Sequence, residues 1–328
     1  ASFREIPSRI RTTADLQPRI LPGEVDGKPA PSFGAYYTSL KYHDLWDNLW
    51  RLSYAPDVAV RFDLHPVAVT YWHGQNYAAG WVTENNRWMA DQSSEEWGEH
   101  GCAEHMSDKQ CRYCFVRIID NSPARCIVHW RYRSVDVGYK PGEMELYCWT
   151  DEYHTIYPDA SAVRRVSWNL DARPNPGWQD IQIFLQPGTD GDDHLQKHAM
   201  TMVNLDGESE RIDFSDGATP QTIEDALIQM VNFKSDYKVF MSAPEGTELR
   251  PWNDPFTGRW DHWPVGQYPS DGREAVALDR VAHTALCSSR NLVYTGNMAI
   301  YGLSNQPATD LVPLATSWNR PPKVVHSR

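Results

Sequence analysis

The sequence lacks an excess of basic residues and lacks any long apolar run. Its 31 Lys and Arg residues are outnumbered by 43 Asp and Glu residues, which gives a formal net charge of −12. Nucleic acids are bound through clustered positive charge that contacts the phosphates, so this balance argues against a nucleic-acid partner. A membrane-spanning helix needs about 20 predominantly apolar residues, and no segment provides them. We therefore expect neither nucleic acid nor a membrane as a partner.

Cysteine is also scarce. Six cysteines in 328 residues neither require nor exclude an oxidising compartment. The chain begins with Ala1 instead of Met, as a mature protein does after removal of a leader. We therefore expect a secreted or periplasmic protein, and we expect no organic cofactor.

Aromatic and turn-forming residues are abundant. The chain has 14 Trp, 16 Tyr and 9 Phe, and its 23 Pro and 20 Gly indicate many turns. Aromatic side chains favour strands and stack on sugar rings, although most of them serve the core. No repeat of about forty residues is present, which disfavours the alternative of a β-propeller. We predict an all-β protein with an N-terminal arm at 1–35 and one large antiparallel β-sandwich domain at 36–328.

Short segments with strand character are separated by turn residues. Cys111–Ile119 and Ala124–Val135 form the clearest pair, a β-hairpin that turns at Asp120–Pro123. A helix is predicted at Thr222–Asn232 from the spacing of its apolar residues, and a long ordered loop at 245–275. The other expected strands are Val58–Phe62, Val67–Trp72, Glu152–Tyr157, Ala162–Trp168 and Asp180–Leu185.

The expected strand Cys126–Arg133 alternates in chemistry. Successive side chains of a strand point to opposite faces, so His129, Arg131 and Arg133 share one face. An imidazole and two guanidinium groups in a row indicate the floor of a cationic cleft, and an ordinary exposed strand face is the alternative. Arginine suits carboxylate or sulfate, because its guanidinium binds two oxygens at once. Further cationic residues that could add to the local positive charge are Lys109, Arg112, Arg164 and Arg165.

A second candidate group lies in Asp151–Asp159. Tyr153 and Tyr157 share one face of the expected strand, and Glu152 and His154 share the other. Tyr, His and Arg together suit β-elimination from a uronate. Arg neutralises the carboxylate, and His or Tyr removes the C5 proton and protonates the leaving oxygen. The alternative is that these tyrosines pack with satisfied hydroxyls.

The Trp-rich loop offers a third group. His262, Arg273, Arg280 and His283 lie within a short stretch, and aspartates close by could orient the two arginines. We expect these residues to contact the substrate, with His283 as a candidate base. The alternative is a loop held together by its own ion pairs.

Metal-ligating side chains follow one another at Cys102, His105, Cys111 and Cys114. Their arrangement as two short ligand pairs is typical of a structural zinc site, which four ligands would close. The alternatives are a disulfide between Cys102 and Cys111, or plain buried thiols.

The segment Tyr71–Tyr77 has the character of a binding edge. Trp72 could form a platform for a sugar ring, and His73 and Asn76 could hydrogen-bond a substrate. The alternative is a strand end with core tryptophans.

Several of these segments carry a family resemblance. They are Trp72–Tyr77, Met106–Tyr113, Val128–Tyr132, Asp151–Asp159 and Ser270–Arg273. They resemble segments of secreted bacterial polysaccharide lyases of the ulvan-lyase-like type, over a stretch from about Val60 to Pro322. The resemblance implies a β-supersandwich or a propeller, and eliminative cleavage of an acidic polysaccharide.

The chain departs from that family at three positions. His73 stands where Arg is expected, His105 where Pro is expected, and Phe115 where a polar residue is expected. These departures put the substrate in doubt more than the reaction class.

The leading hypothesis is a polysaccharide lyase that cleaves beside a uronic acid in an acidic polysaccharide, sulfated or not, such as ulvan. One alternative is a glycoside hydrolase that uses two carboxylates, chosen from Glu84, Asp91, Glu152 and Asp271. Another alternative is a carbohydrate-binding protein without catalysis. The residues expected to carry the elimination are His129 or His283 as base, Tyr153 or Tyr157 as acid or base, and Arg131, Arg165 or Arg273 against the carboxylate.

Overall fold

The computed structural model describes most of the chain in separate ranges. These are residues 33–40, 53, 55–98, 100–108, 111–136, 146–168, 176–186, 189–214, 220, 222–258, 260–263, 281–291 and 297–320. Within the strands, only the backbone is described at 90–93, 146–148, 176–178, 260–263, 281, 291 and 297.

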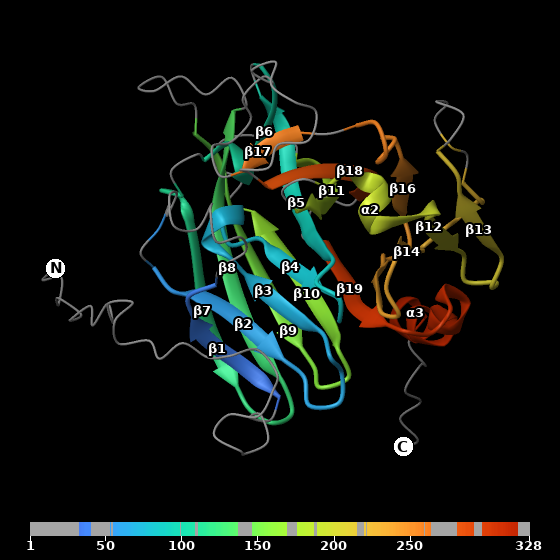
Figure 1. Cartoon of the computed structure of the whole chain (residues 1–328), viewed down its shortest axis with the longest axis horizontal. Coiled ribbons are helices and arrows are strands. Elements are labelled where there is room, and N and C mark those ends of the chain that lie inside the picture. The colour runs from blue at the N-terminus through green and yellow to red at the C-terminus, as the bar shows by residue number, and fades with distance from the viewer. Residues whose placement is uncertain are drawn as a thin grey trace, which may run out of the picture.

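The described strands form two antiparallel layers (Figure 1). The first layer contains, in order of pairing, β1 (Gly34–Thr38), β2 (Asp57–Arg61), β3 (Ala68–Tyr71), β4 (Ala79–Val82), β5 (Trp88–Gly98), β11 (Pro176–Leu185) and β18 (Val281–Asn291), with β16 (Thr247–Pro251) and β17 (Trp260–Trp263) both on β18.

The second layer contains, in order of pairing, β7 (Cys114–Asn121), β8 (Cys126–Asp136), β9 (Leu146–Ile156), β10 (Ser161–Trp168), β19 (Asn297–Ser304), β15 (Lys238–Ser242), β14 (Ile228–Phe233), β12 (Leu195–Val203) and β13 (Ser209–Ile212). The short strand β6 (Gly101–Glu104) pairs with both β5 and β8 and so connects the two layers.

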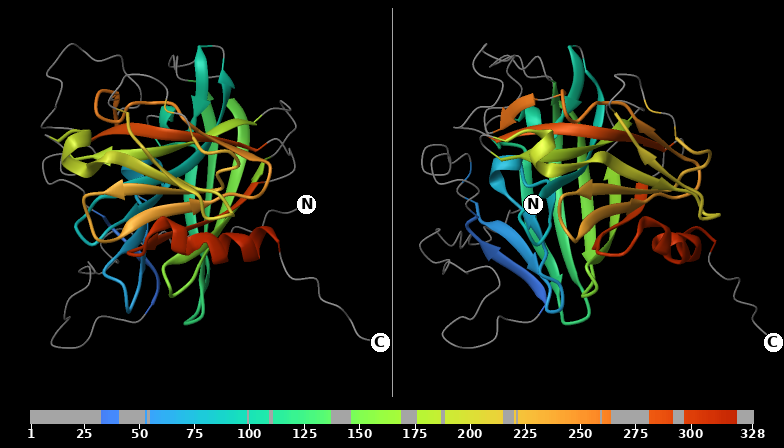
Figure 2. Two further views of the ribbon diagram at one scale, coloured as in Figure 1. Left: turned by 90° about the vertical axis from the view of Figure 1, so that its right-hand side faces the viewer. Right: turned by 45° about the vertical axis from the view of Figure 1, so that its right-hand side comes forward.

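Helices are few and short in the described part of the chain. The helix α3 (Val312–Asn319) and the 3-10 turn η4 (Ala308–Leu311) pack against the outer side of β12, β14, β15 and β19 (Figure 2). The remaining helical elements are α2 (Gly191–His194), η2 (His73–Gln75) and η3 (His105–Ser107). None of the helices among the described residues combines the length and the hydropathy of a membrane-crossing segment.

Large aromatic side chains join the two layers in the core. Trp81 of β4 stacks on Tyr301 of β19 with ring centroids 5.8 Å apart. The indole Nε1–H of Trp130 on β8 donates to the carbonyl oxygen of Asn76 at 2.9 Å. Full burial of such rings stabilises the fold by about 1.5–3 kcal/mol each. The predicted antiparallel β-sandwich is therefore confirmed, and the described strands show no division into propeller blades.

The predicted strands are found, but the predicted helix at Thr222–Asn232 is wrong. Its second half is the strand β14, which pairs with β12 on one side and β15 on the other. Every residue of β14 is buried, so its sequence shows a continuous apolar run instead of the alternation of a half-exposed strand. Asp225 just before it has a φ of 53°, which is typical of a turn.

Two predicted boundaries also need correction. The arm was expected to extend to residue 35, but Gly34–Thr38 already pairs with β2. The region 245–275 was expected to be a loop, but its described part contains β16 and β17, both paired with β18.

Candidate functional site

The register of β7 to β10 places the predicted His and Arg side chains on the outer face of the second layer. The neighbouring residues of β8, such as Val128 and Trp130, lie in the core, so His129 and Arg131 point away from it. Across the strands, Arg117 pairs with His129, which pairs with Tyr153. We call this group the cationic face: Arg117, Arg131, Arg133, Arg165, His129, Asp151, Phe115, Trp149 and Tyr153.

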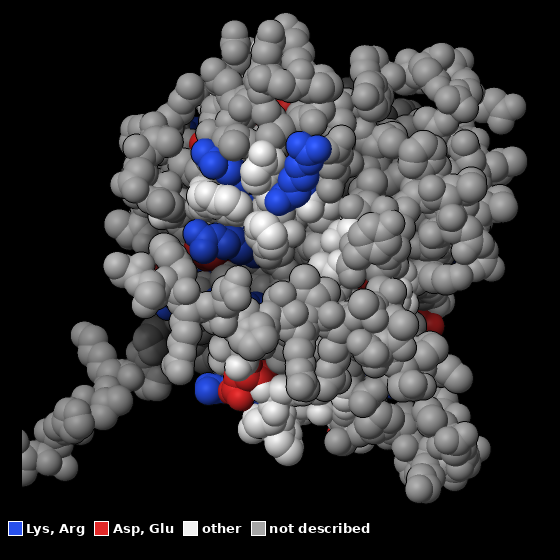
Figure 3. Space-filling model, turned by 90° about the vertical axis from the view of Figure 1, so that its left-hand side faces the viewer, with Lys and Arg blue, Asp and Glu red and all other residues white. Residues whose placement is uncertain are grey.

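Lys and Arg side chains gather on this side of the molecule (Figure 3). Aromatic rings hold the guanidinium groups in place. The guanidinium carbons of Arg131 and Arg133 lie 5.0 and 5.7 Å from the ring centre of Trp149. That of Arg165 lies 5.3 Å from the ring centre of Tyr153. The face is thus an ordered set of cations on a sheet surface.

His129 is fully engaged within this face. Its Nδ1 accepts from Arg117 Nε at 3.0 Å, and its Nε2 lies 2.6 Å from Asp151 Oδ1. Burial lowers the pKa of His129, and the Asp151 carboxylate opposes that shift. With both nitrogens occupied, His129 is poorly placed to accept a proton from a substrate, which argues against its predicted role as base.

The two predicted tyrosines have different surroundings. Tyr153 stacks on His129 with ring centroids 4.4 Å apart, and Arg165 lies over the same ring. Tyr157 lies outside this group, at the turn between β9 and β10, where its backbone N–H donates to the carbonyl of Ser161. The structure therefore does not bring the two tyrosines together around one reacting group.

Two of the expected additional cations do not add to the cationic face. Arg164 is buried and donates from Nε and Nη2 to the Glu152 carboxylate at 2.7 and 2.6 Å. This pairing also occupies Glu152, a candidate for the hydrolase alternative. Arg112 is exposed just before β7, where its backbone N–H donates to Asp108 Oδ1, and the strand register does not place it in this group.

The predicted binding edge is part of the interior. Trp72, His73 and Asn76 are all at most 1% exposed. His73 Nδ1 lies 2.8 Å from Asp57 Oδ1, and the Asn76 amide donates to the carbonyl of Asp108. Because these groups are sealed from solvent, the expected substrate contacts are contradicted.

The four predicted zinc ligands are not brought together into one site, although the Cys111 and Cys114 thiols are neighbours. Cys102, Cys111 and Cys114 are free thiols, which also excludes the Cys102–Cys111 disulfide. His105 is fully buried between the rings of Trp130 and Tyr132, and neither of its ring nitrogens has a hydrogen-bond partner. Within the described residues, the group with the geometry to hold a metal ion is a different one, Glu95, Cys102 and Glu104, whose ligand atoms lie within 4.8 Å of one another.

Several predicted site residues lie outside the described part of the chain. They are Lys109, Arg273, Arg280 and the side chain of His262. The same holds for Asp271 and the side chain of Asp91 among the hydrolase candidates.

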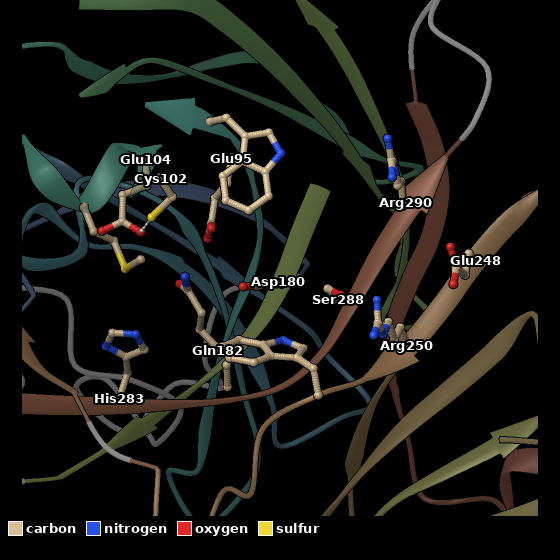
Figure 4. A pocket seen from close by; sticks show the side chains of 14 residues that line it. Glu95, Cys102, Glu104, Asp180, Gln182, Glu248, Arg250, His283, Ser288 and Arg290 are labelled. Carbon is tan, nitrogen blue, oxygen red and sulfur yellow. Dashed lines mark hydrogen bonds between the residues drawn. The ribbon is translucent and has the colours of Figure 1, made fainter. Parts of the chain in front are cut away.

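A second candidate site is a cavity of about 520 Å³ on the outer face of the first layer. Ile181 and Ile183 of β11 lie in the core, so Asp180 and Gln182 point to the opposite side, into this cavity. The other walls come from β5, β6, β16 and β18. Strands that are far apart in sequence thus build one concave site (Figure 4).

One end of the cavity carries carboxyl and thiol groups. Glu104 of β6 accepts from Ser107 Oγ at 3.2 Å and from Cys102 Sγ at 3.5 Å. Burial raises the pKa of Glu104 to about 7. Burial, followed by the Glu104 carboxylate, raises the pKa of the Cys102 thiol above its ordinary value. At neutral pH, Glu104 can therefore both donate and accept a proton.

His283 also lines the cavity, on the same side of the close view as Glu104 (Figure 4). Burial lowers its pKa to about 3, so its imidazole is neutral over the physiological range. The neighbouring His105 behaves alike, because burial and then the charge of His283 lower its pKa to about 3. His283 is the predicted catalytic residue that the structure places in the cavity.

The other end of the cavity carries cations and indole rings. Arg250, Arg290 and Glu248 lie together there, on the paired strands β16 and β18 (Figure 4). Trp97 and Trp252 line the cavity and are 66% and 40% exposed. Large exposed aromatic side chains beside a pocket are typical of ligand platforms.

The sequence interpretation missed most of this cavity. The segment Thr247–Trp252 alternates, with Glu248, Arg250 and Trp252 on one face, and this pattern could have indicated a functional face. Glu104 and Gln182 carry no comparable local signal. They become neighbours only through the pairing of β5 with β11 and β6.

Comparisons with known proteins add little to this geometry. No protein-family model matches the chain, and no curated protein sequence matches it. The chain is similar to the crystal structure of galactose 1-epimerase from Lactobacillus acidophilus NCFM, with a TM-score of 0.34 and 9% sequence identity. That similarity covers 83% of this chain and 99% of the other.

Proposed function

We propose that the protein is a polysaccharide lyase that cleaves an acidic, uronate-containing polysaccharide by β-elimination, with the cavity of the first layer as its active site. The observation that carries this proposal is the placement of Glu104 and His283 in the lining of a single cavity. One of these groups has a pKa of about 7 and the other is a neutral imidazole. Elimination needs such a pair of proton-transfer groups.

In the proposed reaction, His283 accepts the C5 proton of the uronate, whose bound carboxylate raises the pKa of this imidazole from about 3 and so makes it a stronger base. The electrons of the broken C5–H bond form the C4–C5 double bond, and the C4–O bond breaks. The protonated form of Glu104 supplies a proton to the leaving oxygen. Solvent then restores both groups to their starting protonation states, so no other reactant is needed.

The remaining lining residues suit the anionic groups and the rings of the substrate. Gln182 is 1% exposed and lies between the two ends of the cavity, where its amide N–H can donate to the uronate carboxylate (Figure 4). Arg250 and Arg290 can bind a carboxylate or sulfate of an adjacent sugar. Trp97 and Trp252 offer faces on which sugar rings can stack.

The first experiment is a substrate screen. The protein is incubated with ulvan, alginate, pectin and glycosaminoglycans, and the ultraviolet absorbance of the unsaturated uronate is followed. The proposal predicts an absorbance rise on at least one uronic polymer. No rise on any of them would refute it.

The second experiment replaces the proposed acid. Glu104→Gln should lower kcat/KM by at least about 100-fold, because general acid catalysis contributes that much. In the wild type, kcat/KM should fall as the pH rises above about 7, since Glu104 then loses the proton that it donates. Glu224→Gln, an exposed carboxyl outside the cavity, is the matched control and should behave as the wild type. An unchanged rate in Glu104→Gln would contradict the assignment.

A glycoside hydrolase is the second candidate, favoured by one observation. Carboxylate oxygens of Glu95 and Glu104 lie within 4.8 Å of each other. Paired carboxyl groups about 5 Å apart are typical of retaining glycosidases. This alternative predicts new reducing ends without the ultraviolet absorbance, so the same screen separates the two activities.

A further inference from the structure

The cationic face on β7 to β10 lies on the opposite outer side of the sandwich from the cavity. The cavity is lined by the outward residues of β11 and its neighbours in the first layer, whereas the cationic face is formed by the outward residues of β8 and its neighbours in the second. The face therefore cannot share the chemistry of the cavity, and its arginines call for a separate explanation.

The strand register arranges the face in rows. Arg117, His129, Tyr153 and Arg165 stand opposite one another across four strands. Neighbouring strands are about 4.8 Å apart, and successive residues on one face of a strand are about 7 Å apart. The guanidinium groups therefore cover a flat area several sugar units across.

The charges on this face are unbalanced. Among the described residues of the cationic face, the guanidinium groups of Arg117, Arg131 and Arg165 outnumber the single carboxylate of Asp151. Asp151 is shared between His129 at 2.6 Å and Arg131 at 3.6 Å. Like charges side by side on a sheet destabilise it, so their retention in a chain of net charge −12 favours a role in binding an anion.

The arginines are also held ready for a ligand. Trp149 and Tyr153 support three of the guanidinium groups, and Arg117 is fixed by its bond to His129. Side chains that are ordered before binding lose less entropy when a ligand arrives. Arg131 nevertheless keeps 45% of its side chain exposed, so its guanidinium is accessible.

The form of the face favours a polysaccharide over a nucleic acid. The faces of Tyr153 are covered by His129 and by Arg165, so its ring offers no platform for a base, and Phe115 is left as the strongly exposed ring of the face. Binding of single-stranded nucleic acid relies on such platforms. An extended polymer with regularly spaced carboxylate or sulfate groups needs only a flat field of arginines.

We infer that the cationic face is a non-catalytic binding site for a stretch of acidic polysaccharide, remote from the cavity. The choice of polymer rests on the proposed function, whereas the anion-binding site itself rests on the face alone. The site holds the polymer by bidentate contacts to carboxylate or sulfate groups.

The test compares polymer binding by matched charge variants. Arg131→Gln together with Arg165→Gln removes two cations from the face. Arg125→Gln together with Arg320→Gln removes two exposed cations outside it, which are paired with Asp120 and Glu245. Binding is measured by retardation in native gels that contain ulvan, pectate, a glycosaminoglycan or neutral dextran.

The face variant should bind the acidic polymers at least about tenfold more weakly than the wild type, because hydrogen bonds to charged groups are lost. The slope of log Kd against log salt should also fall by about one for each arginine removed. The control pair should stay within about twofold of the wild type, since exposed ion pairs contribute little. Equal binding by the face variant and the wild type, or equal retardation by dextran, would overturn the inference.

One further variant and one further ligand complete the test. Phe115→Glu adds a negative charge at a side chain that is 54% exposed, and it should weaken binding without removing any ion pair. Tighter binding of a DNA oligonucleotide through the same arginines would overturn the assignment to polysaccharide.

Failure of this inference and failure of the proposed function are distinguishable. Turnover of short oligosaccharides takes place in the cavity and should stay within about twofold in the face variant. If no polymer is cleaved but the face variant loses binding, the inference stands and the lyase proposal falls. If cleavage is observed and the face variant binds polymer as the wild type does, the inference falls and the lyase proposal stands.

Discussion

The inner and outer faces of β8, β9 and β10 use similar residue types for opposite purposes. Adjacent arginines on β10 show this most clearly, since Arg164 points into the core and Arg165 to solvent. Arg164 completes a buried cluster with Glu152, while Arg165 lies over the ring of Tyr153. The side of the strand that a residue occupies, and not its type, decides whether it stabilises the fold or is available to a ligand.

The largest expected effect tests the inner face. Arg164→Met should lower the free energy of unfolding by about 3–5 kcal/mol, because it leaves the Glu152 carboxylate buried without its cation. Arg165→Met, one residue away on the outer face, should change that free energy by less than about 0.5 kcal/mol. Urea unfolding of both variants measures the contrast. Similar losses in the two variants would show that the faces do not differ as described.

The sequence revealed this contrast because the strands are half-buried. The alternation of His129, Arg131 and Arg133 with core residues on β8 correctly predicted that these three side chains share the face that points away from the core. The role predicted for that face did not follow from the alternation, since the bonds that occupy His129 come from neighbouring strands.

The cavity was harder to predict than the face. Its proposed acid Glu104 and base His283 are far apart in sequence, on strands that meet only through long-range pairing. The spacing of Cys102 and His105 resembled that of metal ligands, but the 3-10 turn that begins at His105 buries this ring against Trp130. Local sequence patterns predict contacts between residues that are near in sequence. The cavity is built mainly from residues that are far apart in sequence.

The next prediction concerns how the free energy of unfolding depends on pH through the buried His105. Burial lowers the pKa of His105 to about 3 in the folded protein, against about 6.5 when unfolded. The unfolded chain therefore binds the extra proton first, and stability is lost as the pH falls from about 6.5 towards 3. The loss reaches at most about 1.4 kcal/mol per pH unit for this one group.

His105→Phe removes this titration while keeping an aromatic ring in the core. The variant should lose less stability than the wild type between pH 6.5 and pH 4, and should resemble it above pH 7 in its pH dependence. Unfolding in urea at a series of pH values measures the two slopes. Buried His194 and His283 titrate in both proteins, so they cancel in the comparison. Parallel slopes would contradict the assignment to His105.

The smallest expected effect concerns the aromatic support of the outer face. Trp149→Leu removes the ring that lies under Arg131 and Arg133, and exposed cation–π contacts contribute about 0.5–1 kcal/mol. The free energy of unfolding should therefore fall only slightly, whereas affinity for acidic polysaccharide should fall by a few-fold as the guanidinium groups become mobile. A large loss of stability with unchanged polymer affinity would mean that Trp149 serves the fold, and that the outer face resembles the inner face more than its exposure suggests.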